Sequence, residues 1–270
     1  MGDDPVPLDE NGPTRRAFLK SVAAAAAIFA RLKSLSASTF NAFRVVQVTV
    51  GDQPAVRPNA ALVLAQEVRA RTSVLVRLDR VVVPLSSRAV FDYPFLLWAG
   101  DRAFSPLNDR ELGHLEAFLS LGGFLLVDNA GEGAGFSGFD RSLRAQVRRA
   151  FPGRTLQPVP KDHVLMRTFY KVESVAGRRA DYSELEGLEV EDRLALIYSR
   201  NDLTGAWSRD GFGNWEYEAV PGGPTQRESA IRLGVNLVLY SLLLDYKDEQ
   251  SHVEYLLRKR RLRPDQVPSR

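Results

Sequence analysis

Three short polar clusters hold the residues whose types and spacing could do chemistry in this chain. They are Asp101, the pair Asp128-Asn129 and the pair Asn201-Asp202, and each follows a short apolar run. A carboxylate at the end of a buried strand can act as a general base, contact a ligand, or accept backbone hydrogen bonds from the following turn. For Asp128 the pattern slightly favours the last role, with a ligand contact in second place.

His163 is the remaining candidate for acid–base chemistry, and a hydrolase would combine it with Asp128 and Asp202. A single histidine that follows an aspartate is more often a structural hydrogen-bonding group, so these three are weak catalytic candidates. Ser137 and Ser199 are weak nucleophile candidates, because no G-x-S-x-G turn presents either of them.

Composition excludes several kinds of site. The chain has no cysteine, which rules out disulfides, thiolate metal sites and a cysteine nucleophile. The three histidines lie far apart, and none has a ligand partner three or four residues away, so we expect no metal. The glycine-rich stretch 131–135 lacks the G-x-G-x-x-G order and the lysine of a P-loop. We therefore interpret it as a flexible loop and expect no cofactor.

The elements that must position these clusters predict an α/β fold. A helical pattern over 108–121 ends at Gly122, and the apolar run 124–127 is typical of a strand buried on both faces of a parallel sheet. Further short strands are expected near 44–50, 73–76, 80–83, 94–98, 188–191 and 194–198. Helices are expected near 59–68, 139–151 and 228–246, the first capped by Asn59. Because strands alternate with helices, we expect a parallel sheet with helices on both faces.

In a sheet of this kind the carboxyl ends of neighbouring strands meet along one crevice, where ligands bind. The polar strand ends therefore predict a ligand crevice formed by Asp101, Asp128, Asn129, Asn201 and Asp202. The segment 203–224 is expected to be a long loop. Its tryptophans, Trp207 and Trp215, either close over the core or form a partner surface, since exposed aromatic residues are enriched in binding hot spots.

The N-terminal segment predicts export. Residues 14–20 match the twin-arginine motif S/T-R-R-x-F-L-K, and an alanine-rich apolar run follows over 22–30. The residues of the expected signal are Arg15, Arg16, Phe18, Leu19 and Lys20. Cleavage sites are poor, so the segment is expected either to be removed or to remain as an anchor in the inner membrane. The twin-arginine translocase is the expected partner during export, and the expected location is the periplasm or outside the cell.

Charge divides the chain into three parts. Residues 1–37 hold five basic and four acidic side chains, and residues 247–270 hold seven and four, which leaves 24 basic and 25 acidic in residues 38–246. Nucleic-acid binding needs a clustered basic surface on the fold, so we expect none. We expect an N-terminal signal or anchor (1–37), one α/β domain (38–246) and a basic tail (247–270). Either end could contact an anionic membrane surface.

The chain resembles an uncharacterised bacterial family, domain-of-unknown-function family 4159, over residues 43–245. The matching stretches are 93–100, 122–128, 139–140, 162–165, 169–170, 197–203 and 234–240. The resemblance implies a flavodoxin-like sandwich similar to class I glutamine amidotransferases. It also implies frequent export and genes beside MoxR-type ATPases and von Willebrand A-domain proteins. It implies no established activity, and without a cysteine glutaminase chemistry is not expected.

Together these features predict an exported, non-catalytic ligand- or protein-binding domain, and a candidate subunit of a cell-envelope complex. The alternative is a hydrolase that uses Asp128, His163 and Asp202 in the crevice. A scaffold subunit driven by a cytoplasmic ATPase is the third hypothesis.

Overall fold

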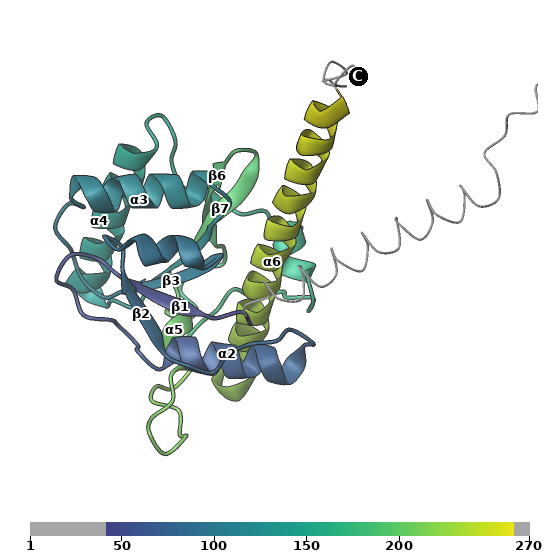
Figure 1. Ribbon diagram of the computed structural model, residues 1–270. Helices are drawn as coiled ribbons and strands as arrows, with labels where there is room; N and C mark the ends of the chain where they lie inside the picture. Colours follow the sequence, from purple (N-terminus) through teal and green to yellow (C-terminus); the bar gives the residue numbers. More distant parts are fainter. Residues whose placement is uncertain (1–41, 262–270) are drawn as a thin grey trace, which may run out of the picture. The chain divides into compact units, whose positions relative to one another are not determined.

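The structure, a computed structural model, describes residues 42–261, with side chains up to residue 244. These residues form a seven-stranded sheet in the order β2-β1-β3-β4-β7-β6-β5 (Figure 1). The strands are β1 (Val46–Thr49), β2 (Val81–Pro84), β3 (Phe95–Gly100), β4 (Phe124–Asn129), β5 (Gln157–Pro158), β6 (Glu186–Val190) and β7 (Arg193–Ser199). β1, β2, β3, β4 and β7 are parallel, whereas β6 pairs antiparallel with both of its neighbours.

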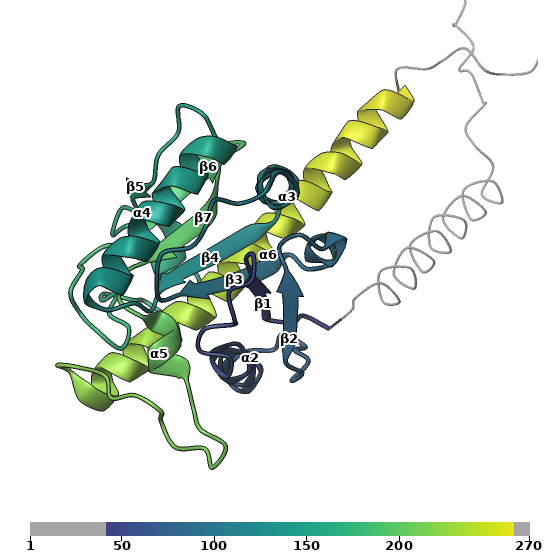
Figure 2. The same ribbon diagram turned by 90° about the vertical axis from the view of Figure 1, so that its left-hand side faces the viewer.

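Helices cover both faces of the sheet, as the sequence predicts (Figure 2). They are α2 (Ala60–Arg71), α3 (Asp109–Ser120), α4 (Gly133–Ala150), α5 (Leu203–Trp207) and α6 (Gly223–Arg261), with the short 3₁₀ helices η1 (Arg88–Asp92) and η2 (Val164–Arg167). α2, α5 and α6 pack together on one face, and α3 packs with α4 on the other. The order of the five parallel strands is the flavodoxin-like one. The expected α/β class is therefore confirmed, with one strand reversed near the sheet edge.

The central strands are apolar on both faces because both faces are covered. Phe124 and Leu126 of β4 face the α2/α5/α6 side, and Leu125 and Val127 face the α3/α4 side. All four are buried. Such a strand has a continuous apolar sequence rather than an alternating one, which is why it could be recognised in the sequence.

Helix α3 has the end signals that the sequence predicts. The Asn108 side chain accepts from the Glu111 amide, and the Glu111 carboxylate accepts from the Asn108 amide, forming a capping box. At the other end Gly122 has a φ of 109°, a conformation that glycine adopts without strain. The expected cap of α2 is wrong: Asn59 precedes that helix but makes no side-chain cap bond. Its amide donates instead to the Arg209 carbonyl at 2.8 Å.

The glycine-rich stretch is the first turn of a helix and not a flexible loop. Helix α4 begins at Gly133, six residues before the expected start. A side chain on Gly131 or Gly135 would collide with the Asp101 carbonyl, and one on Gly138 would press on Ala103. The glycines therefore let the chain after β3 pack directly on the start of α4, and this packing outweighs their poor helix propensity.

The segment 203–224, expected to be a long loop, begins with the five-residue helix α5. Helix α6 also exceeds the expected 228–246 and continues into the expected basic tail (247–270) as far as Arg261. The expected export segment lies outside the described residues. Within residues 42–261, no helix is both long and apolar enough to cross a membrane.

Candidate functional site

The carboxyl ends of β3, β4 and β7 lie side by side, so the structure brings the predicted polar clusters to one edge of the sheet. In register, Asp128 of β4 pairs with Ala99 on one side and Ser199 on the other, and Asn129 pairs with Gly100. The edge follows directly from the parallel pairing of three neighbouring strands.

Asp128 is fully buried, and its carboxylate holds the first turn of α5. One oxygen accepts from the Leu203 amide at 2.9 Å. The other accepts from the Thr204 amide at 2.8 Å and from the Thr204 hydroxyl at 2.6 Å. The first amides of a helix have no partner within the helix, so Asp128 supplies acceptors that the turn needs. This geometry supports the structural role that the sequence slightly favours.

Asp202 is also fully buried, and it precedes α5 with a left-handed backbone at φ 54° and ψ 60°. Its carboxylate accepts from the Gly205 amide at 2.8 Å, and Gly205 has no side chain because one would collide with Asp202. The same carboxylate forms ion pairs with Arg57 at 2.9 Å and Arg178 at 2.5 Å. Asp202 therefore caps α5 and forms ion pairs with two guanidinium groups.

The two carboxylates are close enough to affect each other. The Thr204 hydroxyl lies 2.6 Å from an Asp128 oxygen and 3.4 Å from an Asp202 oxygen. Burial, reinforced by the charge of Asp202, raises the pKa of Asp128 to about 6, although the bonds from Thr204 and Leu203 oppose the rise. The cost of burying the charged carboxylate is therefore larger than the effect of its hydrogen bonds.

Two arginines and a tyrosine that the sequence pattern did not indicate lie beside Asp202. The Arg57 guanidinium lies 3.7 Å from the centre of the Tyr217 ring. Arg178 joins Asp202 to Glu132 at the start of α4 by a second ion pair. Arg57 and Arg178 lie in loops with no recognisable motif around them, so no sequence signal could have found them.

The amides of Asn129 and Asn201 are engaged within the protein. The Asn129 amide nitrogen donates to the Phe136 carbonyl at 3.1 Å and to the Tyr198 hydroxyl at 2.9 Å. The Asn201 amide donates to the Tyr182 carbonyl at 2.8 Å and accepts from the Tyr182 amide at 3.0 Å. Both residues are fully buried and fix neighbouring loops, so neither presents a polar group to a ligand.

The switch point between β1 and β3, where flavodoxin-like folds bind ligands, is almost filled. The cavity there measures about 20 Å³, enough for roughly one water molecule. Asp101, which lines it, forms an ion pair with Arg102 at 2.7 Å near the surface. The predicted crevice is thus a set of neighbouring residues without a ligand-sized opening at this point.

His163 lies away from the other two catalytic candidates. It lines a cavity with Leu194 near the start of β7, whereas Asp202 follows the end of that strand. Leu194 and Ser199 are five residues apart, or roughly 16 Å at about 3.3 Å per residue. The predicted hydrolase set is therefore not assembled. Asp128 and Asp202 are neighbours, whereas His163 lies near the opposite end of β7. His163 instead accepts from the Leu165 amide at 3.2 Å and caps η2.

The two nucleophile candidates are also held in structural contacts. The buried Ser199 hydroxyl accepts from the Asn201 amide at 3.3 Å. Ser137 is exposed on α4 and donates to the Gly133 carbonyl at 3.4 Å. Across residues 42–261, no group of three or more His, Asp or Glu side chains is placed to hold a metal ion.

The predicted partner surface is wrong for one tryptophan. Trp207 is fully buried, and its indole nitrogen donates to the Ala230 carbonyl of α6 at 3.0 Å. Trp215 is 36% exposed and lies between the guanidinium groups of Arg209 and Arg227, 3.7 and 4.3 Å from its ring centre. Among the side chains that the structure describes, the most exposed aromatic one is Phe212, at 93%. The flanking glycines in Asp210-Gly211-Phe212-Gly213 were a turn signal that could have located it.

Comparison with known proteins gives a family and no activity. No curated protein matches the chain. The sequence profile of one family matches residues 42–242, which is most of the chain and the whole of the sheet. This protein therefore belongs to the family described as "Domain of unknown function (DUF4159)".

Proposed function

We propose that this protein is an exported, non-catalytic protein-binding domain that engages a cell-envelope partner through its loop 208–217. The observation that carries the proposal is the exposure of Phe212 on a braced turn. The buried polar groups at the carboxyl edge support it indirectly. They bind one another and the backbone, which leaves no open group for catalysis there.

The tip of the loop is held by one aspartate. One Asp210 oxygen accepts from the Phe212 amide at 2.9 Å and from the Asn214 amide at 2.8 Å. The Asp210 amide donates to the Asn214 carbonyl at 2.9 Å. The Phe212 ring is thus presented on an ordered turn, and an ordered binding element loses less entropy on association.

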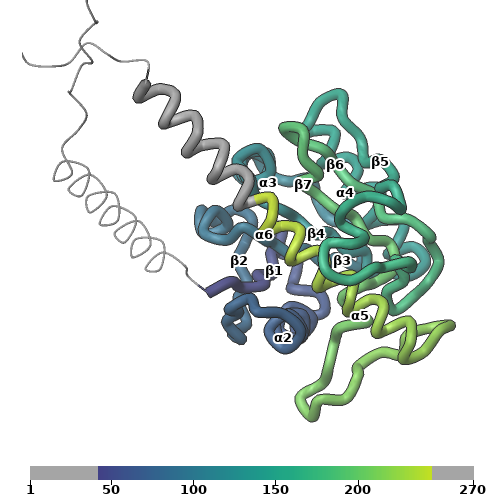
Figure 3. Tube along the Cα trace, turned by 90° about the vertical axis from the view of Figure 1, so that its right-hand side faces the viewer, coloured from purple at the N-terminus to yellow at the C-terminus, as the bar shows by residue number. Residues whose placement is uncertain are grey.

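The base of the loop is fixed to the body of the domain. Arg209 and Arg227 lie on the Trp215 ring, and the Arg209 side chain donates to the Gly213 carbonyl at 3.1 Å. Asn59 links the loop to the start of α2. The loop extends away from the sheet between α5 and α6 (Figure 3). Aromatic residues, Phe included, are enriched in the cores of protein interfaces, so a rigid, projecting ring suits a partner contact.

Export and an envelope partner are the parts of the proposal that rest on sequence. The twin-arginine motif at 14–20 supports export through the twin-arginine translocase. The family resemblance implies a sandwich similar to class I glutamine amidotransferases, and the chain has no cysteine to act as their nucleophile, which supports a non-catalytic scaffold. Membership of a complex with MoxR-type ATPases and von Willebrand A-domain proteins is the corresponding proposal for the partner.

The test is photocrosslinking in native cells with full-length protein. A photoreactive phenylalanine analogue replaces Phe212 in one strain and Leu121 in another, because Leu121 is also strongly exposed, at 78%, but lies beyond α3. We expect a discrete adduct with one envelope protein from position 212 and none from position 121. The same adducts from both positions, or none from 212, would refute the proposed surface.

A further inference from the structure

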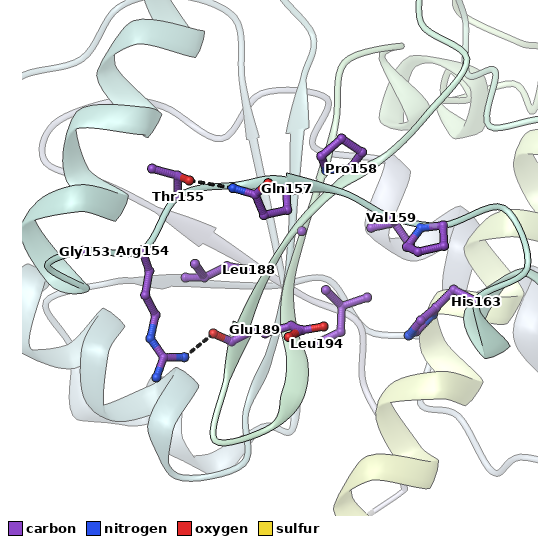
Figure 4. A pocket seen from close by; sticks show the side chains of 12 residues that line it. Gly153, Arg154, Thr155, Gln157, Pro158, Val159, His163, Leu188, Glu189 and Leu194 are labelled. Carbon is purple, nitrogen blue, oxygen red and sulfur yellow. Dashed lines mark hydrogen bonds between the residues drawn. The ribbon is translucent and has the colours of Figure 1, made fainter.

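A cavity of about 400 Å³ lies beside the β6–β7 hairpin, near the end of β7 that is remote from the Asp128–Asp202 pair. It is formed by the chain segment 153–160, the β6–β7 hairpin and His163 at the start of η2 (Figure 4). Its volume is within the range of small-molecule sites, about 300–1,000 Å³. None of its lining residues takes part in the carboxyl-edge network or in the loop 208–217.

The floor of the cavity is apolar. Val159 and Leu194 are buried side chains that line it, and Pro158 and Pro160 add ring faces along the segment above. Gly187 also lines the floor, and a side chain there would collide with Leu194. The site therefore offers an apolar surface beside its polar groups.

His163 provides a hydrogen-bond donor at one end. Its Nδ1 accepts from the Leu165 amide at 3.2 Å, so the proton of the neutral ring is on Nε2. The Tyr240 ring packs edge-on against the imidazole at 5.6 Å and fixes its orientation. Burial lowers the pKa of His163, although the charges of Glu189 and Asp162 oppose the fall, so the ring is neutral near pH 7. Figure 4 shows the ring directed toward Leu194 and Glu189.

Glu189 provides an acceptor beside this donor. Its side chain is exposed and reaches over Leu194, while its own carbonyl is held by Arg154 at 2.5 Å (Figure 4). Among the residues that line the cavity, Glu189 and Arg154 carry opposite charges and His163 is neutral. The lining therefore has no net charge with which to select an anion or a cation.

We propose that this cavity binds an uncharged ligand with neighbouring hydroxyl groups on a compact ring, the chemistry of a saccharide. A hydroxyl group both donates and accepts, so adjacent hydroxyls can donate to the Glu189 carboxylate and accept from His163 Nε2–H. The C–H face of the ring then covers Leu194 and Val159. An isolated amine would use only Glu189, and an apolar ring would leave both polar groups without a partner.

The test is saturation-transfer NMR on the full-length protein with methyl glucoside, methyl galactoside and N-acetylglucosamine as probes. Cyclohexanol tests the apolar face alone, and leucinamide tests simple attraction of a cation to Glu189. We expect signals from at least one sugar and at least tenfold weaker binding in Glu189→Ala, with partial recovery in Glu189→Gln, which keeps an acceptor. Glu116→Ala, an exposed change on α3, is the matched control and should bind as wild type.

Circular dichroism confirms that each variant is folded, and His163→Phe provides a second test of the donor because it keeps the ring against Tyr240. It should weaken the sugar about as much as Glu189→Ala does. Three results would overturn the inference: no sugar binds, Glu189→Ala and His163→Phe bind as wild type, or leucinamide or cyclohexanol binds at least as well as every sugar.

Discussion

The carboxylate of Asp128 accepts hydrogen bonds from both the amide and the hydroxyl of Thr204, a residue 76 positions further along the chain. This contact joins the end of β4 to the first turn of α5, and α5 leads directly into the loop that carries Phe212. The buried edge therefore fixes the helix that leads into the proposed binding loop.

Asp128→Ala should lower the free energy of unfolding by about 1–3 kcal/mol, because buried amide donors lose their acceptor. Urea denaturation at neutral pH measures the change. Asp128→Asn is the isosteric comparison: it keeps one acceptor oxygen but turns an NH₂ group toward an amide of α5, so it should also destabilise. An unchanged or raised midpoint for the alanine variant would contradict the structural role.

The pH dependence of stability should carry the signature of Asp128. Its pKa is raised from the ordinary 3.8 to about 6 in the folded protein, so the folded state binds this proton more tightly than the unfolded state does. The stability that it contributes is present below about pH 4 and is lost as pH rises through about 6. Between pH 7 and pH 5, wild type should gain about 1 kcal/mol relative to Asp128→Asn. Urea midpoints of wild type and Asp128→Asn measured at both pH values test this. The same difference between the two proteins at pH 7 and pH 5 would show that Asp128 does not titrate in this range.

The sequence could predict the polar residues at the carboxyl ends of the strands, but not the contacts that hold them. The strand 124–127 was predictable because a strand buried on both faces is uniformly apolar, and the capping box of α3 is a local signal. The hydrogen bonds that Thr204 donates to Asp128 and the ion pairs of Asp202 with two arginines depend on long-range packing. No short-range pattern encodes such contacts.

Short elements and long-range contacts explain why other features could not be predicted from the sequence. Helix α5 has only five residues, so no periodicity could reveal it or show that Trp207 faces the core. The glycines at the start of α4 have poor helix propensity, and their role depends on the approach of Asp101, which follows β3. His163 could be identified in the sequence as an acid–base candidate, but its separation from Asp128 depends on how the sheet is assembled.

Asp202→Ala should be strongly destabilising, by about 3 kcal/mol, because it leaves the partly buried Arg57 and Arg178 without their shared carboxylate. Asp101→Ala removes a carboxylate that pairs with Arg102 at the surface and should cost less than about 1 kcal/mol. Thermal unfolding of the two variants makes the comparison. Equal losses of stability in the two variants would show that the buried ion pairs of Asp202 stabilise the fold no more than the surface pair of Asp101.

Export should require both Arg15 and Arg16, since lysine does not reproduce the planar donor geometry of a guanidinium group. A fusion of residues 1–40 to a reporter that is active only after export in the folded state measures this. Replacing both arginines by lysine should abolish reporter activity, whereas Lys33→Arg, outside the motif, should not. Undiminished export of the double variant would show that residues 14–20 are not a twin-arginine export signal.

Phe212 and Trp207 should respond to substitution in opposite ways, because one is 93% exposed and the other is fully buried. Trp207→Ala removes the side chain that packs α5 against α6 and donates to the Ala230 carbonyl, so it should cost about 3–5 kcal/mol. Phe212→Ala should change the free energy of unfolding by less than about 0.5 kcal/mol while removing the proposed partner contact. Urea denaturation of both variants tests the stability difference, and the position-212 adduct tests the contact. A large loss of stability in Phe212→Ala would mean that the ring supports the loop itself, and its exposure would then no longer support a binding role.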